Sequence, residues 1–305
     1  MEWLRDRAVG SILGLALGDA LGAPFEFRRA HEIPSPIPAF ELAWMGKAPG
    51  TWTDDTAMAR NLSRSIVECG GLDANDVLER HLRWLATDPP DVGNQTRLAL
   101  AEAASGTREP ARVVFERRGP EVSAGNGSVM YCAPLGVAYA RRSGELFELA
   151  PALSAITHWD ERCRTACLAV TLAAAALVRG EDGVGAAVGA VRGLEGREGA
   201  EELEYLVEQA GRARPVDGPD QGFALFAAGL ALRTVAEAAT VDTGLLSVVA
   251  LGGDTDTNAA VAGALLGARD GFEALPHAWL DVLADRDEIE KEAEALADFA
   301  ERDPA

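Results

Sequence analysis

The chain has 305 residues, of which 48% are hydrophobic and 25% are charged, a composition that is typical of globular proteins and excludes a disordered or low-complexity chain. Its formal net charge of −20 repels a phosphate backbone, so we expect no bulk nucleic-acid binding. The apolar stretch near the N-terminus is interrupted by Gly14, Gly18 and Asp19 and lacks a cleavage site, so we expect a cytoplasmic protein that contacts no membrane.

Hydrophobic spacing is helical along almost the whole chain, and the alternation that is typical of strands is nearly absent. The segments predicted to be helical are 3–20, 56–69, 74–86, 95–105, 109–118, 128–141, 145–157, 160–179, 199–212, 221–239, 243–251, 256–269 and 286–301. Asp73 and Asp160 stand where helix N-caps are expected, and Gly180 and Gly271 mark expected helix ends. We therefore predict an all-α fold, in a single compact multi-helix domain that spans residues 1–305.

Some segments do not fit a helix. Residues 28–50 hold four prolines and cannot form a continuous helix. A loop of this length in a compact chain is usually functional or mobile, and we predict that it is a mobile lid. Residues 119–127 are rich in glycine, which permits a tight turn or a close approach of the backbone to a ligand. Residues 302–305 are expected to form a short C-terminal tail.

Two short acidic segments each stand at the start of a predicted helix, Thr-Trp-Thr-Asp-Asp-Thr at 51–56 and Gly-Gly-Asp-Thr-Asp-Thr at 252–257. Capping needs only one such residue per helix, whereas each segment carries four in sequence. Four carboxylates brought together repel one another unless they are protonated or bridged by a cation. Oxygen ligands with no histidine or cysteine beside them suit Mg²⁺, Mn²⁺ or Ca²⁺ rather than zinc. We favour a split two-metal site over simple capping.

Three further features fit around such a site. Glu26 stands between Phe25 and Phe27, and an apolar setting raises the pKa of a carboxyl group and suits it to proton transfer; an ordinary charged loop residue is the alternative. Residues 125–128 (Gly-Asn-Gly-Ser) open a predicted helix with an amide-rich turn that is suited to phosphate oxygens, although many helix starts look alike. His158 lies between two predicted helices, where it either contacts a ligand or caps a helix.

The order of these motifs resembles the ADP-ribosylglycohydrolase family. The motifs that carry the resemblance are GxxxGxAxGDALGxxxE, TDDT, VGNQTR, GNGSxM-APLG, THxD and ALGGDTDTxAAxAGALLGA. They cover residues 8–282, and the combination of TDDT with GGDTDT is highly specific. The resemblance implies an all-α domain with two Mg²⁺ or Mn²⁺ ions in a central cleft. The implied activity is hydrolysis of the glycosidic bond that joins ADP-ribose to an acceptor, which reverses ADP-ribosylation.

The resemblance also implies the roles of individual residues. The implied ligands of one metal ion are Thr53, Asp54, Asp55 and Asp256. Those of the other ion are Asp254, Asp256 and Thr257, with Asp256 as the bridge. The implied catalytic residues are Glu26, Asp55 and Asp256. The implied ligand-binding residues are Asn94, Gly125, Asn126, Gly127, Ser128, Met130, Tyr131, His158 and Gly253.

Two positions depart from the family pattern. Asn94 stands where we expect an aspartate in the arginine-linked branch of the family, and Tyr131 stands where many relatives are expected to have arginine. A carboxylate at position 94 would be the natural partner of a substrate guanidinium, so its loss disfavours arginine-linked ADP-ribose. The acceptor stays open among arginine, serine, a nucleobase and a small ester.

Hydrolysis at the anomeric carbon passes through an oxocarbenium-like state. Most of the carboxylates here would be committed to metal, so either Glu26 or a metal-bound water moves the proton. We expect ADP-ribosylated protein as the partner and a monomeric chain. The alternatives are a non-catalytic ADP-ribose-binding or structural member of the family, and a metal phosphohydrolase that acts on the diphosphate.

Overall fold

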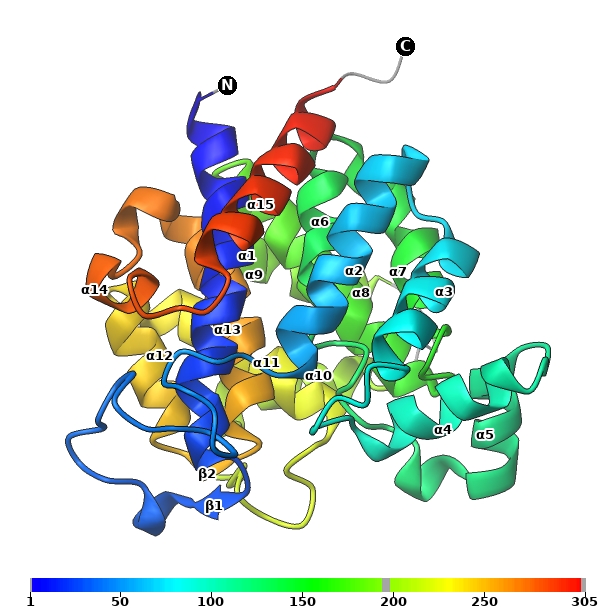
Figure 1. The fold of residues 1–305 in the computed structure, drawn as a ribbon, viewed down its shortest axis with the longest axis horizontal. Coiled ribbons are helices and arrows are strands. Elements are labelled where there is room, and N and C mark those ends of the chain that lie inside the picture. The colour runs from blue at the N-terminus through cyan, green and yellow to red at the C-terminus, as the bar shows by residue number, and fades with distance from the viewer. Residues whose placement is uncertain (1, 194–197, 303–305) are drawn as a thin grey trace.

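The computed structural model describes residues 2–193 and 198–302, and its helices confirm the predicted all-α fold. Figure 1 shows these helices gathered around α1 and α13, with the short strands at one end of that pair. The α-helices are α1 (Glu2–Gly22), α2 (Asp54–Cys69), α3 (Ala74–Leu85), α4 (Asn94–Ala104), α5 (Pro110–Arg118), α6 (Ala133–Ala138), α7 (Leu146–Ser154), α8 (Glu161–Val178), α9 (Gly183–Arg192), α10 (Ala200–Gln209), α11 (Ala224–Glu237), α12 (Val241–Val249), α13 (Thr255–Asp270), α14 (His277–Leu280) and α15 (Arg286–Glu301). The strands are β1 (Arg28–Arg29) and β2 (Gly252–Gly253).

Helices α1 and α13 run antiparallel and lie in backbone contact. The residues that meet, in chain order on α1 and in reverse order on α13, are Gly10, Gly14 and Gly18 with Gly267, Gly263 and Ala259. A Cβ atom at Gly18 would lie 2.0 Å from the carbonyl oxygen of Ala259, so a larger residue cannot be accommodated there. At the end of the pair, Thr255 Oγ1 donates a 2.8 Å hydrogen bond to the Gly22 carbonyl. The contact therefore fixes the start of α13 beside the end of α1.

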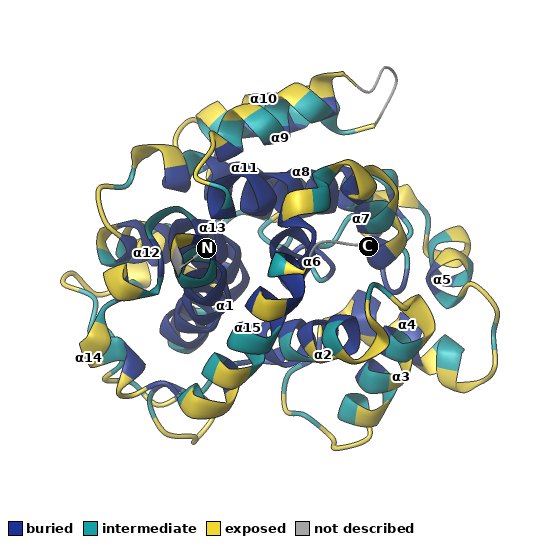
Figure 2. Cartoon of the chain, turned by 90° about the horizontal axis from the view of Figure 1, so that it is seen from above, coloured by how far each residue is buried: buried dark blue, intermediate teal, exposed yellow. Residues whose placement is uncertain are grey.

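The core surrounds this pair of helices. In Figure 2, α1, α8, α11 and α13 are almost entirely buried, whereas α9 and α10 form an outer layer with one exposed face. The segment Trp3–Phe25 is long and apolar enough to cross a membrane, but 94% of its 18-residue window is buried inside the structure. A buried core helix passes the same test, and the packing described above places α1 in the core of the fold.

The bounds of one predicted helix are wrong. The pattern predicts a helix over 128–141, yet α6 spans only Ala133–Ala138. Residues 127–131 form turns instead. In these turns the Asn126 carbonyl oxygen accepts hydrogen bonds from the backbone N–H groups of Val129 and Met130, at 2.8 and 3.1 Å, and the Val129 carbonyl oxygen accepts one from Cys132 at 3.3 Å. This difference decides which side chains face the site.

The sequence pattern also misses α9 and α14. Three of the ten residues of α9 are glycine, which lowers its helix propensity. Its start is stabilised by Asp182, whose Oδ1 accepts a 2.9 Å hydrogen bond from the Gly185 N–H group. Helix α14 has only four residues, too few for a periodic pattern.

The proline-rich segment 28–50 contacts the rest of the fold at several points. Strand β1 pairs antiparallel with β2, Trp44 is only 6% exposed, and the Phe40 ring lies 5.4 Å from that of Trp279. The mobility of this segment stays a prediction. The tail predicted at 302–305 lies almost entirely outside the described residues.

Candidate metal-dependent active site

The two acidic segments form the first turns of α2 and α13. Thr53 is the N-cap of α2, and its Oγ1 accepts a 3.4 Å hydrogen bond from the Asp55 N–H group. Asp254 precedes the first residue of α13. The antiparallel contact of α1 with α13 holds the second segment beside the end of α1, and a further residue of α1 holds the first.

That further residue is Asp19, whose side chain is fully buried. Both of its carboxylate oxygens accept 3.0 Å hydrogen bonds from the Thr53 N–H group. Its Oδ2 also accepts from the N–H and Oγ1 of Thr56, at 3.0 and 2.6 Å. Asp19 therefore caps α2 from another helix and positions the Thr-Asp-Asp-Thr turn. The sequence places this residue at the end of a helix but assigns it no role.

Hydroxyl groups join the two segments directly. Asp55 Oδ2 accepts hydrogen bonds from Thr53 Oγ1 and from Thr257 Oγ1, at 3.3 and 3.4 Å. Asp54 and Asp254 are also buried, at 7% exposure each. The structure thus brings together all six residues that the resemblance assigns to the metal ions.

The charge of this cluster fits cations. Burial, reinforced by the neighbouring carboxylates, raises the pKa of Asp54, Asp55 and Asp256 well above the ordinary aspartate value. Oδ1 of Asp55 and Oδ1 of Asp256 are buried and accept no hydrogen bond from the described residues. Buried carboxylate oxygens without a donor are costly, whereas a divalent ion that takes oxygen ligands would satisfy them. The donor set therefore suits Mg²⁺ or Mn²⁺.

Glu26 and Asp91 extend the cluster toward solvent. One carboxylate oxygen from each of Glu26, Asp91 and Asp256 lies within 4.8 Å of the other two. Burial, followed by the charge of Asp91, raises the pKa of Glu26 to about 9. The apolar setting expected from its two phenylalanine neighbours holds only in part, because Phe25 is buried but Phe27 is 61% exposed.

Asp91 is a site residue that the sequence pattern did not identify. It follows Pro89 and Pro90 in the connection between α3 and α4, three residues before Asn94. Asp91 is half-buried. Its pKa is raised overall, because the effect of burial outweighs that of a hydrogen bond with Asp54, which acts in the opposite direction. The only sequence signal is an acidic residue just before the Val-Gly-Asn-Gln-Thr-Arg motif. Asn94 itself is exposed at the rim of the cleft.

A cleft of about 440 Å³ opens from this cluster toward the turn at 125–127. The predicted site residues that line it are Glu26, Asp54, Asn94, Gly125, Asn126, Gly127, Met130, His158, Asp254, Asp256 and Thr257. Asn126 Nδ2 donates a 2.8 Å hydrogen bond to Asp254 Oδ2, so the glycine turn is tied to the acidic cluster.

His158 and Gly127 form the far wall of the cleft. A Cβ atom at Gly127 would lie 2.9 Å from His158 Cε1, so the ring and the turn touch only because position 127 is glycine. His158 Nδ1 lies 2.9 Å from Thr157 Oγ1. Burial lowers the pKa of His158 to about 4, so the ring is neutral and offers Nε2 as a hydrogen-bonding group rather than as a charge.

Three predicted ligand-binding residues do not line the cleft. Ser128 Oγ lies 3.0 Å from Ser154 Oγ in the core, and the Tyr131 ring is fully buried edge-on to His81 at 5.2 Å. Both side chains point inward because residues 127–131 form turns rather than a helix. Gly253 belongs to β2, where its carbonyl accepts a 2.7 Å hydrogen bond from the Phe27 N–H group. The side chains of Ser128 and Tyr131 are therefore buried behind the cleft and do not line it, in contrast to the expected contact with a ligand.

The fold and the cleft define a class of protein, in which the N-termini of two helices gather carboxylates as metal-dependent hydrolases do. The chain belongs to the ADP-ribosylglycohydrolase family, whose model matches residues 2–305. It is a hydrolase that cleaves the glycosidic bond of ADP-ribose conjugates, and metal dependence is typical of the family.

Individual relatives cover nearly the whole chain. ADP-ribosyl-[dinitrogen reductase] glycohydrolase of Rhodospirillum rubrum is 32% identical over 97% of this chain and 97% of its own length. ADP-ribosylarginine hydrolase Tri1 of Serratia proteamaculans is 28% identical over 95% of this chain and 79% of its own. Human ADP-ribosylhydrolase ARH3 is 27% identical over 88% and 87%. A solved structure described as an ADP-ribosylglycohydrolase-related protein complex superposes with a TM-score of 0.78 and 33% identity, covering 98% of this chain and 100% of that one.

Proposed function

We propose that this chain removes ADP-ribose from arginine side chains of proteins in a metal-dependent reaction. The observation that carries the proposal is the Asp91 carboxylate, which lies beside Glu26 and Asp256 in the cleft. The sequence disfavours arginine because position 94 carries no carboxylate, but Asp91 supplies one three residues earlier. A guanidinium is the group that a carboxylate binds with two parallel hydrogen bonds.

The shape of the cleft orients the substrate. The glycine turn at 125–127 and the neutral His158 ring form one end of the cleft, and backbone amides of such turns suit a diphosphate. The ribose next to the bond that breaks then lies over the acidic cluster, and the arginine lies toward Asp91. Two ions, Mg²⁺ or Mn²⁺, would be held by the six residues of the two acidic segments. When bound, they supply positive charge that fixes the ribose hydroxyl groups and the attacking water.

Glu26 is placed to move the proton. It accepts a proton from the attacking water as the bond between the anomeric carbon and the guanidine nitrogen breaks. It then donates that proton to the departing guanidine, which leaves as a guanidinium paired with Asp91. Cations beside Asp256 would lower the pKa of Glu26 from its value of about 9 toward the range where it acts as a base.

The name of one relative supports the arginine linkage, and the name of another supports a modified protein as the substrate. Tri1 is named an ADP-ribosylarginine hydrolase, and the relative from Rhodospirillum rubrum is named for the modified enzyme on which it acts. Neither name fixes the linkage for this chain, so the linkage needs a direct measurement.

The test compares two peptides of the same sequence, one ADP-ribosylated on arginine and the other on serine, with Mn²⁺ present. We expect release of ADP-ribose from the arginine peptide only. Asp91→Asn keeps the size of the side chain but removes its charge, and kcat/KM should fall by about 10-fold to 200-fold, because a charged hydrogen-bonded pair contributes roughly 1.5–3 kcal/mol. Preferential cleavage of the serine peptide, or release of AMP in place of ADP-ribose, would contradict the proposal.

A further inference from the structure

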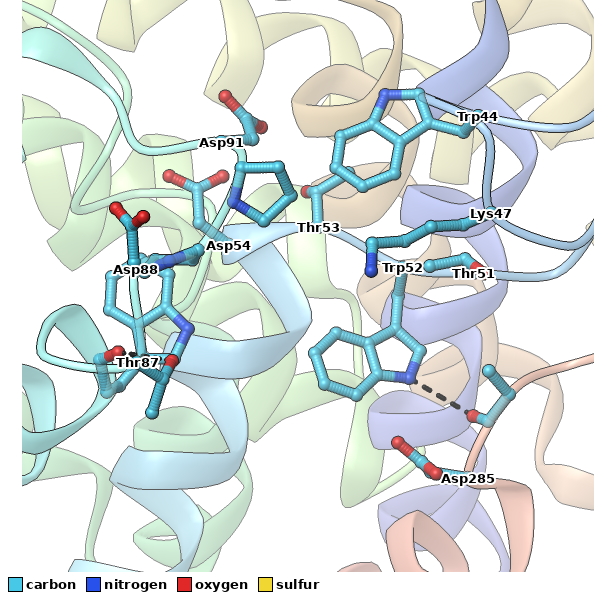
Figure 3. A pocket seen from close by; sticks show the side chains of 14 residues that line it. Trp44, Lys47, Thr51, Trp52, Thr53, Asp54, Thr87, Asp88, Asp91 and Asp285 are labelled. Carbon is cyan, nitrogen blue, oxygen red and sulfur yellow. Dashed lines mark hydrogen bonds between the residues drawn. The ribbon is translucent and has the colours of Figure 1, made fainter.

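A second cavity adjoins the cleft and has no role in the reaction described above. Its volume is about 450 Å³, and it shares Asp54 and Asp91 with the cleft. Figure 3 shows Asp54, Asp88 and Asp91 along one side of this cavity and Trp44, Trp52 and Lys47 along the other. It therefore begins where the acceptor end of the cleft stops. We refer to it as the tryptophan cavity.

Three indole rings from separate parts of the chain line the tryptophan cavity. Trp44 comes from the proline-rich segment and Trp52 from the turn before α2, whereas Trp84 comes from the end of α3. Trp52 Nε1 donates a 3.1 Å hydrogen bond to the Ala284 carbonyl, which fixes this ring. Trp44 and Trp84 stack on no cation among the described residues, whereas Trp52 already has Arg60 over its ring at 5.3 Å. Trp44 is only 6% exposed, so Trp84, which is partly exposed, is the ring that offers a face to a further group.

The charges of the cavity favour a cation. Asp285 is compensated by Arg60, whose Nη1 lies 3.4 Å from its Oδ2. Asp91 is hydrogen-bonded with Asp54 and lies near the charge of Arg97. Asp88 forms no ion pair with the described residues, and neither does Lys47, the one basic residue that lines the cavity. Lys47 is exposed, and its flexible chain can turn toward solvent. The uncompensated Asp88 carboxylate and the partly exposed Trp84 ring in the same cavity are complementary to a planar cation.

We propose that the tryptophan cavity binds a second arginine of the protein substrate, a neighbour of the arginine that carries ADP-ribose. This inference rests on the proposed function, because the acceptor must leave the cleft past Asp91. A guanidinium stacks on an indole face and forms paired hydrogen bonds with a carboxylate at the same time, which an ammonium does less well. Asp88 and Trp84 then determine specificity for the sequence around the modified arginine.

The experiment uses peptides that carry one ADP-ribosylated arginine and vary at the flanking positions. Each flanking position holds arginine, its uncharged analogue citrulline, or norleucine, and ADP-ribose release is measured with the metal-loaded protein. We expect kcat/KM to be about 5-fold to 10-fold higher for arginine than for citrulline at one or two flanking positions, because one stacking contact and one exposed ion pair with Asp88 combine there. Norleucine should behave like citrulline.

Two variants connect this preference to the cavity. Asp88 has a φ of 55°, a conformation that asparagine also tolerates, so Asp88→Asn removes only charge. Trp84→Leu removes an aromatic face. In both variants the ratio of kcat/KM between the arginine and citrulline peptides should fall to below about 2, because only one weak contact with the flanking arginine remains. The matched control is Glu109→Gln, an exposed acid with a φ of 51° at the start of α5, which should leave the ratio unchanged.

Each outcome decides one of the two proposals. Equal rates on the arginine and citrulline peptides overturn the inference, as does a preference that survives in both Asp88→Asn and Trp84→Leu. If no arginine-linked peptide is cleaved, the proposed function fails, and binding of N-acetyl-argininamide decides the inference by itself. Saturable change of tryptophan fluorescence that is lost in Trp84→Leu supports the cavity, and absence of any saturable change overturns it.

Discussion

Single residues set the chemistry of this cleft through their neighbours rather than through their own type. Glu26 has a raised pKa because it is buried beside Asp91 and Asp254, and Asp19 is unavailable to a ligand because it caps α2. Two carboxylates near each other along α1 and the turn after it therefore have opposite roles. One is held by four hydrogen bonds, and the other remains free to exchange a proton.

Replacing Glu26 separates binding from chemistry. Glu26→Gln keeps size and polarity but cannot accept a proton at neutral pH, and general acid–base groups contribute about 10² to 10⁴ in rate. We expect kcat to fall in that range, with ADP-ribose affinity within a few fold of the parent and with metal content unchanged. Turnover near the parent value would assign the proton to a metal-bound water, and loss of metal would make Glu26 a ligand.

Substitution of Asp256 should change the melting temperature in opposite directions with and without metal. Its buried carboxyl has a raised pKa, and such a group costs stability above its unfolded pKa. Asp256→Asn should therefore melt higher than the parent protein in EDTA. In Mn²⁺ it should melt lower if Asp256 is the bridging ligand, because bound metal then no longer stabilises the native state of the variant. Thermal unfolding gives the two melting temperatures, and metal analysis gives the number of bound ions. Full metal content in Asp256→Asn would contradict the bridging role. Asp54→Asn should lower the affinity for only one of the two ions.

At the scale of secondary-structure elements, the contact of α1 with α13 positions the second acidic turn of the site. The alignment of Gly10, Gly14 and Gly18 with residues of α13 lets two helix backbones touch, and the acidic turn before α13 is fixed as a result. These glycines belong to a sequence motif that is typical of the family. Their spacing of four residues is also typical of two helices that pack at close distance.

Gly18 tests this contact against helix propensity. Alanine is the better helix former by about 1 kcal/mol, but a Cβ atom at Gly18 would lie 2.0 Å from a backbone oxygen of α13. Overpacking costs about 1–3 kcal/mol or more, and a 2.0 Å approach to backbone belongs at the upper end of that range. After the gain in helix propensity, Gly18→Ala should therefore lose about 2 kcal/mol of unfolding free energy, together with metal affinity. The control is Gly189→Ala on α9, where a Cβ meets nothing within 4 Å and stability should rise. Urea titration of both variants decides it.

Local patterns predicted most of the helices, though not α9 and α14, and both acidic turns, because capping and metal-ligand chemistry depend on consecutive residues. Asp91 was missed because its role depends on which loop folds over the cleft. The inward direction of the Ser128 and Tyr131 side chains was not predicted, because a turn and a helix start share the same residues. Distances across the fold, and the direction in which a turn points a side chain, are not encoded in a local pattern.

For the whole molecule, buried histidines predict a dependence of stability on pH. Burial lowers the pKa of His81 from 6.5 to about 3. Between these values the unfolded chain binds a proton that the native chain does not, so the free energy of unfolding falls as the pH falls, by up to about 1.4 kcal/mol per unit. Chemical denaturation at pH 7 and pH 5 should show a smaller loss in His81→Phe than in the parent. The exposed His31→Phe should match the parent, and equal losses in all three would contradict the assignment.

The pairing of α1 with α13 also bears on how the protein is made. The hydrogen bond that closes the pair joins residues 233 positions apart. During synthesis α1 therefore leaves the ribosome long before its partner exists, and its apolar, glycine-lined face has nothing to cover it. Contacts of such long range form late and leave early chains prone to aggregation. The second acidic turn is made only when translation has reached α13. A chain that stalls before that point has the first acidic turn but lacks the second, and we expect it to be inactive.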